Sequence, residues 1–465
     1  MRRLNELMEI ALQIPLAPVT KNRRLPTRLI DVGFRGPGKE HDEPRLVITA
    51  NYPPLQDADE DQRYIALSYC WGPSEKAARQ LMTKTLTLQD RLRQIPFSTL
   101  PKTHQDALQI CTLLGVRYIW IDSLCIVQDD KSDWEREADQ MGVVYARAYL
   151  TICAGQGNSS LDGFLMRTCP SNSAKIPFTS SLKPAVSGCF SLFAPSRECP
   201  EVLTLIPGKE FDPFDLGLTM YDPYAYDKNC SWSERGWTFQ EAILSPRILF
   251  FGKSMVHVCS GDDLIYSEDA IYDITPKEVQ DKSNRFLRNM QQESLGTSED
   301  DMWYQWRGLI SSYSCRSLTY RSDIFPALSA LAKIWTERAK GDCLAGIFSS
   351  DLNNGLLWSI EREQSASEYL STFTEEAYTA PSWSWASQPR GIIWVSHAKT
   401  TYKPEFQLLD SHVTLDGLSP YGRVKDGFLL LSTKICPIPS TRMRHNPLWW
   451  GFVFPYELLA DNGTS

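Results

Sequence analysis

The segment between Tyr64 and Ala154 alternates strand patterns with helix patterns, and this order restricts the fold more than any other feature of the chain. The stretches "YIALS", "VRYIWID" and "YLTICA" are short apolar runs, which are typical of buried strands. An amphipathic helix pattern separates each run from the next. Strand, helix and strand in this order form βαβ units, so the segment predicts an α/β fold with a mostly parallel sheet and flanking helices.

Two helices are predicted between these strands. Thr103 stands where an N-cap of the first helix is expected, and Gly115 stands where that helix ends. Ser132 and Glu135 have the spacing of a capping box, which predicts the start of the second helix. One apolar face of the second helix contains Trp134, Ala138, Met141, Tyr145 and Ala148.

The rest of the chain has weaker periodicity. Residues 1–60 are predicted to be a lead-in with two short strand-like pieces that packs on the first domain. The first domain is expected at 61–255, with long loops between 155 and 227, and a mixed helical and β region is expected at 256–465. In that last region, the tryptophans of "PSWSWAS" alternate by two, which favours one face of a strand and a packing seam between the two halves.

Charge and cysteine usage exclude several classes of protein. The chain has 48 basic and 56 acidic residues, a net charge of −8, which argues against binding nucleic acid through bulk charge. No window approaches the roughly 18 uncharged apolar residues of a membrane span, and the N-terminus lacks the apolar run of a secretory signal, so a soluble cytoplasmic protein is expected. The twelve cysteines contain no CxxC pair and the six histidines are dispersed, so neither a disulfide framework nor a metal site is predicted.

Glu137 is a candidate catalytic residue because of its position on the second helix. It falls at the border of the apolar face, whereas Glu135 and Asp139 point away toward solvent. Loss of hydration at such a border raises the pKa of a carboxyl group, which suits acid–base chemistry or stabilisation of an oxocarbenium ion. The alternative is a structural glutamate that pairs with an arginine such as Arg235.

Asp122 is a second candidate because it ends a predicted parallel strand, where ligands bind in open α/β sheets. The alternative is a turn or N-cap residue. Cys125 follows in the apolar stretch "SLCIV", where burial raises the pKa of a thiol, so core packing is favoured over a nucleophile. The GxG of "AGQGNSSLDG" follows a strand, but neither a helix nor a distant acidic partner accompanies it, so it is a weak signal for a phosphate loop.

Three stretches of the chain together resemble a known family. "YIALSYCWG" at Tyr64–Gly72, the stretch Leu100–Ala154 with "LGVRYIWIDSLCIVQDD", and "RGWTFQEAILSPRILFF" at Arg235–Phe251 are similar to the three blocks of the fungal heterokaryon incompatibility domain, in order and spacing. "RSLTYRSDIFPALSALA" and "APSWSWAS" resemble segments that accompany this domain in many members. His104 departs from the pattern, because an aromatic residue is expected there, so the resemblance gives this histidine no family-wide role.

The resemblance implies a part in fungal non-self recognition, in which fusion of incompatible cells triggers a death reaction. It implies that the domain is the toxic effector. The family is also remotely similar to TIR domains, some of which cleave NAD, so the resemblance implies a remotely TIR-like fold and NAD or a related nucleotide as a substrate. No cofactor is expected.

The corner after the first strand is a candidate ligand site. If the strands share one sheet, Ser68, Tyr69 and Trp71 lie beside Asp122, where an aromatic shelf can stack a base or a nicotinamide ring. The alternative is that these aromatic residues only cover the edge of the sheet. In "RGWTFQEAILSPR", Arg235 and Glu241 are polar groups among aromatic residues, and a buried arginine needs a partner, which can be Glu137, Asp122 or a ligand phosphate.

The sequence therefore leaves three functions open. The first is a death effector that cleaves a nucleotide at its glycosidic bond, with Glu137 as the acid. The second is a non-enzymatic module that assembles with itself or with a sensor protein, or a chain recruited to regulate a biosynthetic pathway. The third is a cysteine hydrolase built on Cys125 and His104, which ranks last because of the apolar setting of the thiol.

Overall fold

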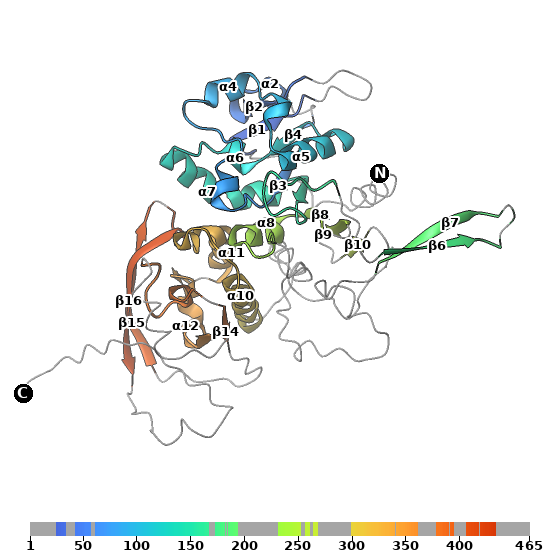
Figure 1. Ribbon diagram of the computed structural model, residues 1–465. Coiled ribbons are helices and arrows are strands. Elements are labelled where there is room, and N and C mark those ends of the chain that lie inside the picture. Colours follow the sequence, from blue (N-terminus) through green and yellow to red (C-terminus); the bar gives the residue numbers. More distant parts are fainter. Residues whose placement is uncertain are drawn as a thin grey trace, which may run out of the picture. The chain divides into compact units, whose positions relative to one another are not determined.

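The three strands predicted between Tyr64 and Ala154 belong to one sheet of eight strands, which lies in the described part of residues 1–295 (Figure 1). The strand order is β10-β9-β8-β5-β3-β4-β1-β2. The strands are β1 Arg28–Asp31, β2 Arg45–Ile48, β3 Tyr64–Ser68, β4 Tyr118–Trp120, β5 Leu150–Cys153, β8 Arg247–Phe251, β9 Val256–Ser260 and β10 Leu264–Ser267.

The sheet is mixed, which corrects the prediction of a mostly parallel sheet. The four central strands β8, β5, β3 and β4 run parallel, as the βαβ pattern predicts. The strands on both sides of this centre pair antiparallel. The connections from β8 to β9 and from β9 to β10 are too short for a crossover helix, and such short connections permit only antiparallel pairing.

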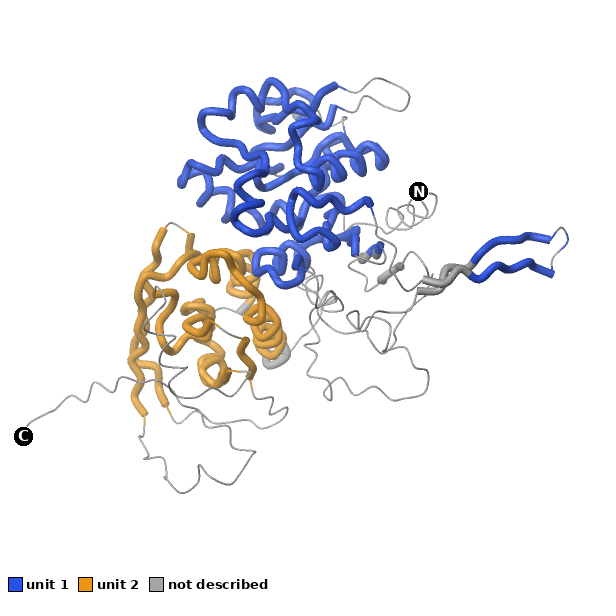
Figure 2. The backbone as a smooth tube through the Cα atoms, viewed as in Figure 1, with its two compact units in different colours: residues 1–295 blue, residues 296–465 orange. Residues whose placement is uncertain are grey.

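The computed structural model separates the chain into two compact units, residues 1–295 and 296–465, which are described one at a time (Figure 2). Within the described residues, no helix is both long and apolar enough to span a membrane. The structure describes residues 25–33, 42–56, 61–166, 173–181, 183, 185–193, 231–252, 256–260, 264–267, 299–339, 341–360, 378–389, 391–394, 406–417 and 419–433. The sequence predicts that the polar stretch after Pro276 is an exposed helical connector. As far as residue 298, this stretch lies outside the described residues.

Both predicted crossover helices are present, but each begins differently from the prediction. The first, α5, already includes Thr103, whose hydroxyl binds the loop after β5 instead of capping the helix. The second, α7, is capped by Asp130, whose carboxylate accepts hydrogen bonds from the backbone N–H groups of Ser132 and Asp133. The capping box predicted at Ser132 is therefore wrong by two residues. The helices of this unit are α2 Pro53–Gln56, α3 Ser74–Ala77, α4 Leu88–Arg93, α5 Lys102–Leu113, α6 Asp122–Cys125, α7 Lys131–Arg147 and α8 Gly236–Leu244, with 3-10 turns η1 Thr49–Asn51 and η2 Phe97–Thr99.

The strand order reverses at β3, and this reversal positions the site described below. Helix α5 leads from β3 to β4 on one side, whereas α7 leads from β4 back past β3 to β5 on the other side. Right-handed crossovers in opposite directions place the two helices on opposite faces of the sheet. Trp120 and Tyr145, which are fully buried, pack edge to face between β4 and α7.

The remaining described elements lie in a hairpin of the first unit and in the second unit. The hairpin consists of β6 Ser173–Thr179 and β7 Ser187–Phe193. The second unit contains α10 Glu299–Ser314, η5 Arg321–Asp323, η6 Pro326–Leu328, α11 Ser329–Ala339, β11 Cys343–Leu344, β12 Ile347–Phe348, η7 Ser349–Asp351, α12 Leu352–Gly355, β13 Trp358–Ile360, η8 Trp385–Ser387, β14 Ile392–Trp394, β15 Phe406–Asp416 and β16 Arg423–Thr433.

The strand predicted for "PSWSWAS" is wrong. The segment forms a turn and the 3-10 helix η8, in which the side chain of Ser384 accepts a hydrogen bond from the backbone N–H of Ala386. Trp385 is buried, and its indole N–H donates to the carbonyl of Gly346 at 3.0 Å. The ring of Trp385 also packs against Tyr313 of the same unit. The alternation of two tryptophans therefore arises from a capped turn, because serine competes well for backbone hydrogen bonds.

Candidate functional site

Polar side chains gather where the strand order reverses, at the carboxyl ends of β3 and β4. In open α/β sheets with this kind of reversal, ligands bind in the crevice outside the carboxyl ends of the strands. The loop after β3 turns sharply at Gly72, whose backbone φ is +95°. A Cβ atom on Gly72 would lie 2.5 Å from Cβ of Ser159, so glycine is required for the contact between this loop and the loop after β5.

Asp122 is half-buried and opens α6 directly after β4. The indole N–H of Trp71 donates to Asp122 Oδ2 at 2.7 Å, and the backbone N–H of Ser123 donates to Oδ1 at 2.6 Å. Burial raises the pKa of Asp122, and the hydrogen bond from Trp71 opposes this shift. The corner after the first strand therefore lies beside Asp122.

Glu241 of α8 lies behind this corner and is 5% exposed. The fully buried hydroxyl of Ser68 donates to Glu241 Oε2, and the indole N–H of Trp232 donates to Ser68 Oγ at 2.7 Å. Burial raises the pKa of Glu241 to about 7; the bond from Ser68 and the charge of Arg235 lower it, whereas the charge of Asp122 raises it. A carboxyl group in this state can take up and release a proton near neutral pH.

Arg235 connects the two carboxyl groups electrostatically. It occupies the N-cap position of α8 and donates from Nη1 to the backbone carbonyl of Tyr69 at 2.7 Å. Its positive charge lowers the pKa of both Asp122 and Glu241. Because the side chain is only partly buried, Arg235 is also placed to bind an anionic group of a ligand.

The two aromatic residues of the predicted shelf have different environments. Tyr69 is 4% exposed, and its hydroxyl oxygen lies at hydrogen-bonding distance from Ser123 Oγ, at 3.1 Å, and from Gln80 Oε1, at 3.2 Å. Its ring packs edge to face on His104, at a centroid distance of 5.0 Å. Trp71 is half-buried. Trp71 is thus the more exposed residue of this pair, and Tyr69 supports the corner from inside the core.

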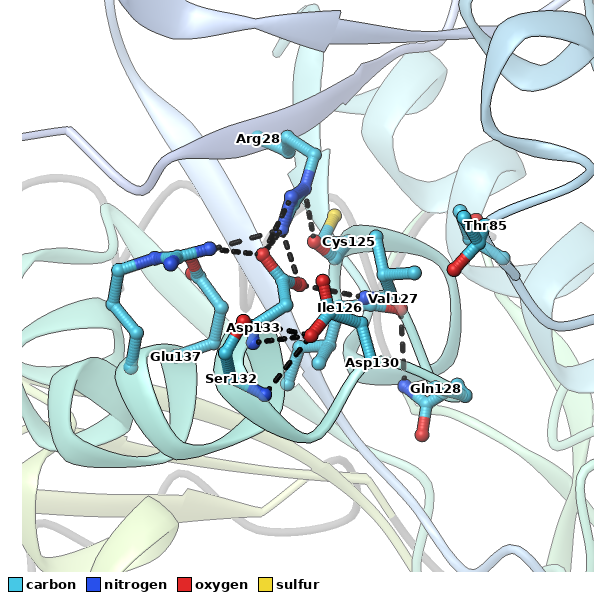
Figure 3. Close-up of polar contacts among 12 residues, drawn as sticks. Arg28, Thr85, Cys125, Ile126, Val127, Gln128, Asp130, Ser132, Asp133 and Glu137 are labelled. Atoms are coloured by element: carbon cyan, nitrogen blue, oxygen red, sulfur yellow. Dashed lines mark hydrogen bonds and ion pairs between the residues drawn. The ribbon is translucent and has the colours of Figure 1, made fainter.

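Glu137 lies in a separate cluster, at the junction of β1, α6 and α7 (Figure 3). Its Oε1 is 3.8 Å from Nη2 of Arg28 and 3.7 Å from Nε of Arg136, and the side chain is 2% exposed. Arg28 also forms hydrogen bonds to both carboxylate oxygens of Asp133 and donates from Nε to the carbonyl of Cys125 at 2.7 Å. Burial raises the pKa of Glu137, and the charge of Arg28 lowers it. The arginines beside this glutamate are therefore Arg28 of the lead-in and Arg136 of the same helix.

Cys125 and His104 are both fully buried. Burial raises the pKa of the Cys125 thiol to about 12 and lowers the pKa of His104 to about 3. A thiol and an imidazole in these states supply neither a thiolate nor a titrating base at neutral pH. The arrangement gives no support to a cysteine hydrolase.

The loop after β5 is fixed to α5 by its backbone. The buried carboxylate of Asp106 accepts hydrogen bonds from the N–H groups of Phe164 at 2.8 Å and Leu165 at 3.1 Å. Its other partner is Lys102 of the same helix. The N–H groups of this stretch are therefore used within the protein, which favours a structural role for the loop that follows the GxG sequence.

Sequence reasoning missed two residues of the site. Trp232 lies outside any periodic segment, so no pattern distinguishes it from the other tryptophans of the chain. Tyr145 is correctly expected on the apolar face of α7, but the sequence did not predict that Tyr145 lowers the pKa of Glu241. Among the residues that the structure describes, no group of three or more His, Cys, Asp or Glu side chains is arranged to hold a metal ion.

Comparison with known proteins gives one match. Residues 64–241 match the model of the family described as Heterokaryon incompatibility protein (HET). This match confirms the resemblance noted from the sequence blocks, and it covers Ser68, Asp122 and Glu241. No curated protein and no solved structure matches the chain.

Proposed function

We propose that this heterokaryon incompatibility domain protein is an effector of non-self recognition whose first unit hydrolyses the glycosidic bond of NAD or a related nucleotide. The observation that carries the proposal is the buried carboxyl group of Glu241, which is bound by Ser68 and whose pKa is raised by burial and by the charge of Asp122, beside the strand reversal. Cell death would follow from loss of the nucleotide. The match of residues 64–241 supports a role in heterokaryon incompatibility.

The remote likeness to TIR domains belongs to the same proposal. The parallel strands have the order β4-β3-β5-β8, which in chain order is 2-1-3-4, as at the centre of flavodoxin-like sheets. Such sheets bind nucleotides at the strand reversal, which here lies between β3 and β5; Trp71 follows β3, and Asp122 follows the neighbouring strand β4. This order supports the likeness at the level of topology.

The site offers one group for each part of a nucleotide. Trp71 presents a ring to stack against the base, and Arg235 presents a positive charge to a phosphate. Hydrolysis breaks the bond between the anomeric carbon and nicotinamide, which leaves with the bonding electrons as a neutral molecule. The half-buried carboxylate of Asp122 stabilises the positive charge that develops on the sugar. A water oxygen then bonds to the anomeric carbon, and its proton passes to the pair formed by Asp122 and Glu241.

The test is nicotinamide release from NAD by the purified full chain and three variants. We expect Glu241→Gln and Asp122→Asn to reduce release by about 100-fold or more, as the loss of an acid–base group commonly does. Glu137→Gln is the matched control, because it neutralises another buried carboxylate of the same unit.

We expect Glu137→Gln to retain release within a few-fold, with thermal stability measured for every variant. Absence of release by the parent chain contradicts the proposal. Loss of release in Glu137→Gln at parental stability, with Glu241→Gln active, would instead return the catalytic role to Glu137.

A second function, self-assembly, is favoured by the hairpin of β15 and β16 in the second unit. Each strand has 11 residues, and the apolar residues Leu409, Phe428 and Leu430 are 55%, 49% and 52% exposed. Phe428 and Leu430 are two residues apart on β16 and therefore point to the same face. Long hairpins with exposed apolar residues are prone to associate.

Light scattering of the full chain over a range of concentrations tests this second function. The parent is expected to gain mass with concentration, and Leu430→Lys to remain at the mass of one chain. Equal masses for parent and variant at all concentrations exclude this face from assembly.

A further inference from the structure

Two loops meet at the strand reversal, because one follows β3 and the other follows β5, the two strands between which the order changes direction. The contact is close, since a Cβ atom on Gly72 would lie 2.5 Å from Cβ of Ser159. A few residues further along each loop, Nζ of Lys76 lies 3.2 Å from Oδ1 of Asp162. Ligands of open α/β sheets bind between such loops. The two loops therefore close the place where a ligand is expected.

The loop after β5 is the fixed side of this contact. Thr103 of α5 donates from its backbone N–H to the carbonyl of Ser160 at 3.0 Å, and its hydroxyl donates to the carbonyl of Ser159 at 3.3 Å. The same hydroxyl accepts from the N–H of Gly163 at 3.2 Å, and the buried carboxylate of Asp106 holds the next two residues of the loop. Ser159 and Ser160 are 1% and 0% exposed, so water does not compete for these bonds.

The segment of residues 73–79, which contains α3, is the other side of the contact, and it is held weakly. All of its residues are exposed except Ala77, which is half-buried. The backbone N–H groups of residues 76–80 donate to carbonyls of residues 73–77, so these bonds stay within the segment. The side chains of Lys76 and Asp162 are 45% and 36% exposed, and exposed ion pairs contribute little to stability. The segment is therefore attached to the loop after β5 by an interaction that solvent weakens.

Both ends of this segment are fixed points. Gly72 precedes it with a φ of +95°, and a glycine has access to both signs of φ, so this residue can act as a hinge. Gln80 follows the segment, is 4% exposed, and has its Oε1 3.2 Å from the hydroxyl oxygen of Tyr69. Three residues later, the fully buried hydroxyl of Thr83 donates to the carbonyl of Leu124 at 2.7 Å. An exposed segment between a glycine and a buried anchor can swing as one unit.

We infer that residues 73–79 form a flap that controls access to the strand reversal, with Gly72 as its hinge and the ion pair between Lys76 and Asp162 as its latch. When the ion pair breaks, the flap swings away from the loop after β5 and a ligand enters between the two loops. The closed flap excludes water from the site. Trp71 lies before the hinge, so its bond to Asp122 is kept in both states. The inference rests on the proposed function for the identity of the ligand as NAD or a related nucleotide.

The experiment measures how fast N-ethylmaleimide alkylates a cysteine beneath the flap in the full chain without ligand. Ser159→Cys is the reporter, because the loop at Gly72 covers this position, and mass spectrometry of the peptide that contains position 159 separates it from the native cysteines. Lys76→Gln added to the reporter removes the latch, so we expect the rate to rise about two- to five-fold. Gly72→Ala prevents closure, because its Cβ meets the Cβ at position 159, and we expect a larger rise of about 10-fold.

Lys131→Gln is the matched control. Lys131 forms an exposed ion pair of the same kind with Glu135 on α7, 3.6 Å from Nζ to Oε1 and outside both loops. We expect this variant to leave the alkylation rate of the reporter unchanged. Salt gives a second readout, because it screens exposed ion pairs. The rate should therefore rise with salt in the reporter alone and stay constant in the reporter that carries Lys76→Gln.

Faster alkylation in Lys76→Gln, with a salt dependence that this variant abolishes, supports the inference even if Gly72→Ala fails to fold. Equal rates with and without Lys76→Gln overturn it, as does an equal rise in Lys131→Gln. The alkylation needs no turnover, so its result is independent of NAD cleavage. The expected rates without nicotinamide release would remove the proposed function and keep the flap, and release with equal alkylation rates would do the reverse.

Discussion

Two buried carboxylate clusters lie in the first unit, and their partners differ in kind. Glu137 and Asp133 are held by the arginines Arg28 and Arg136. Glu241 instead meets the hydroxyl of Ser68 and the negative charge of Asp122. The charges of the two arginines lower the pKa of Glu137, whereas the like charge of Asp122 raises the pKa of Glu241. The comparison teaches that burial alone does not identify a catalytic acid.

The largest effect is expected when the arginine of the first cluster is removed. Arg28→Met leaves two carboxylates at 3% and 2% exposure without their buried cation. Breaking a buried ion pair by removing one partner typically costs about 3–5 kcal/mol. Urea denaturation followed by tryptophan fluorescence measures this loss. A loss below about 1 kcal/mol would show that Arg28 is not what fixes these carboxylates.

The contribution of the second cluster to the stability of the protein is expected to depend on pH. The pKa of Glu241 is raised from 4.5 to about 7 in the folded protein, so the folded state binds more protons than the unfolded state between these values. Stability contributed by this residue is therefore greatest below pH 4.5 and is lost as pH rises to 7, by about 3 kcal/mol in total.

Glu241→Gln removes this dependence. We expect the difference in unfolding free energy between Glu241→Gln and the parent to grow in favour of the variant from pH 5 to pH 7. Urea denaturation at a series of pH values measures the difference. A difference that stays constant over this pH range would contradict a raised pKa of Glu241 in the folded protein.

A smaller effect is expected for His104, a buried titratable group whose two ring nitrogens have no hydrogen-bond partner in the described structure. His104→Phe keeps the aromatic contact with Tyr69 and removes two unsatisfied polar atoms. We expect a gain of about 1–2 kcal/mol at pH 7. The gain should increase below pH 6.5, because the lowered pKa of His104 prevents the folded state from binding the proton that the unfolded state binds. A loss of stability would point to a buried polar partner for the imidazole.

The smallest effect is expected for Arg136, the second arginine of the first cluster. Its side chain is 57% exposed, so solvent screens its attraction to Asp133 and Glu137. Exposed ion pairs contribute about 0–1 kcal/mol. Thermal unfolding of Arg136→Met should therefore differ little from that of the parent, in contrast to Arg28→Met. Equal losses in the two variants would show that the cluster acts as one network.

Much of the site could be predicted from the sequence, because several of its residues lie at the ends of predicted strands. The first strand was predicted with its observed bounds, and the position of Asp122 after the next strand placed it beside Trp71. Arg235 and Glu241 were recognisable as polar residues among aromatic ones. Period and polarity are local properties, so a single sequence displays them.

Other features depend on contacts between distant segments and were not predictable. Arg28 reaches Asp133 across 105 positions of the chain, and Trp232 reaches Ser68 across 164. The burial of Tyr69 depends on packing against α5, which no alternation within its own strand reveals. The starts of both helices were predicted wrongly. The hydroxyl of Thr103 bonds to the loop after β5 instead of capping α5, and Asp130 caps α7 in place of Ser132.

The match at residues 64–241 includes β3, β4 and β5 but ends before β8 and begins after β2. Five of the eight strands of the sheet, β1, β2, β8, β9 and β10, are therefore supplied by flanking sequence. A recombinant fragment cut to the matched borders would expose both sides of its three remaining strands and lack Arg28. Such a fragment would be a poor sample for any assay, and a usable expression clone has to begin before residue 25 and continue past residue 267.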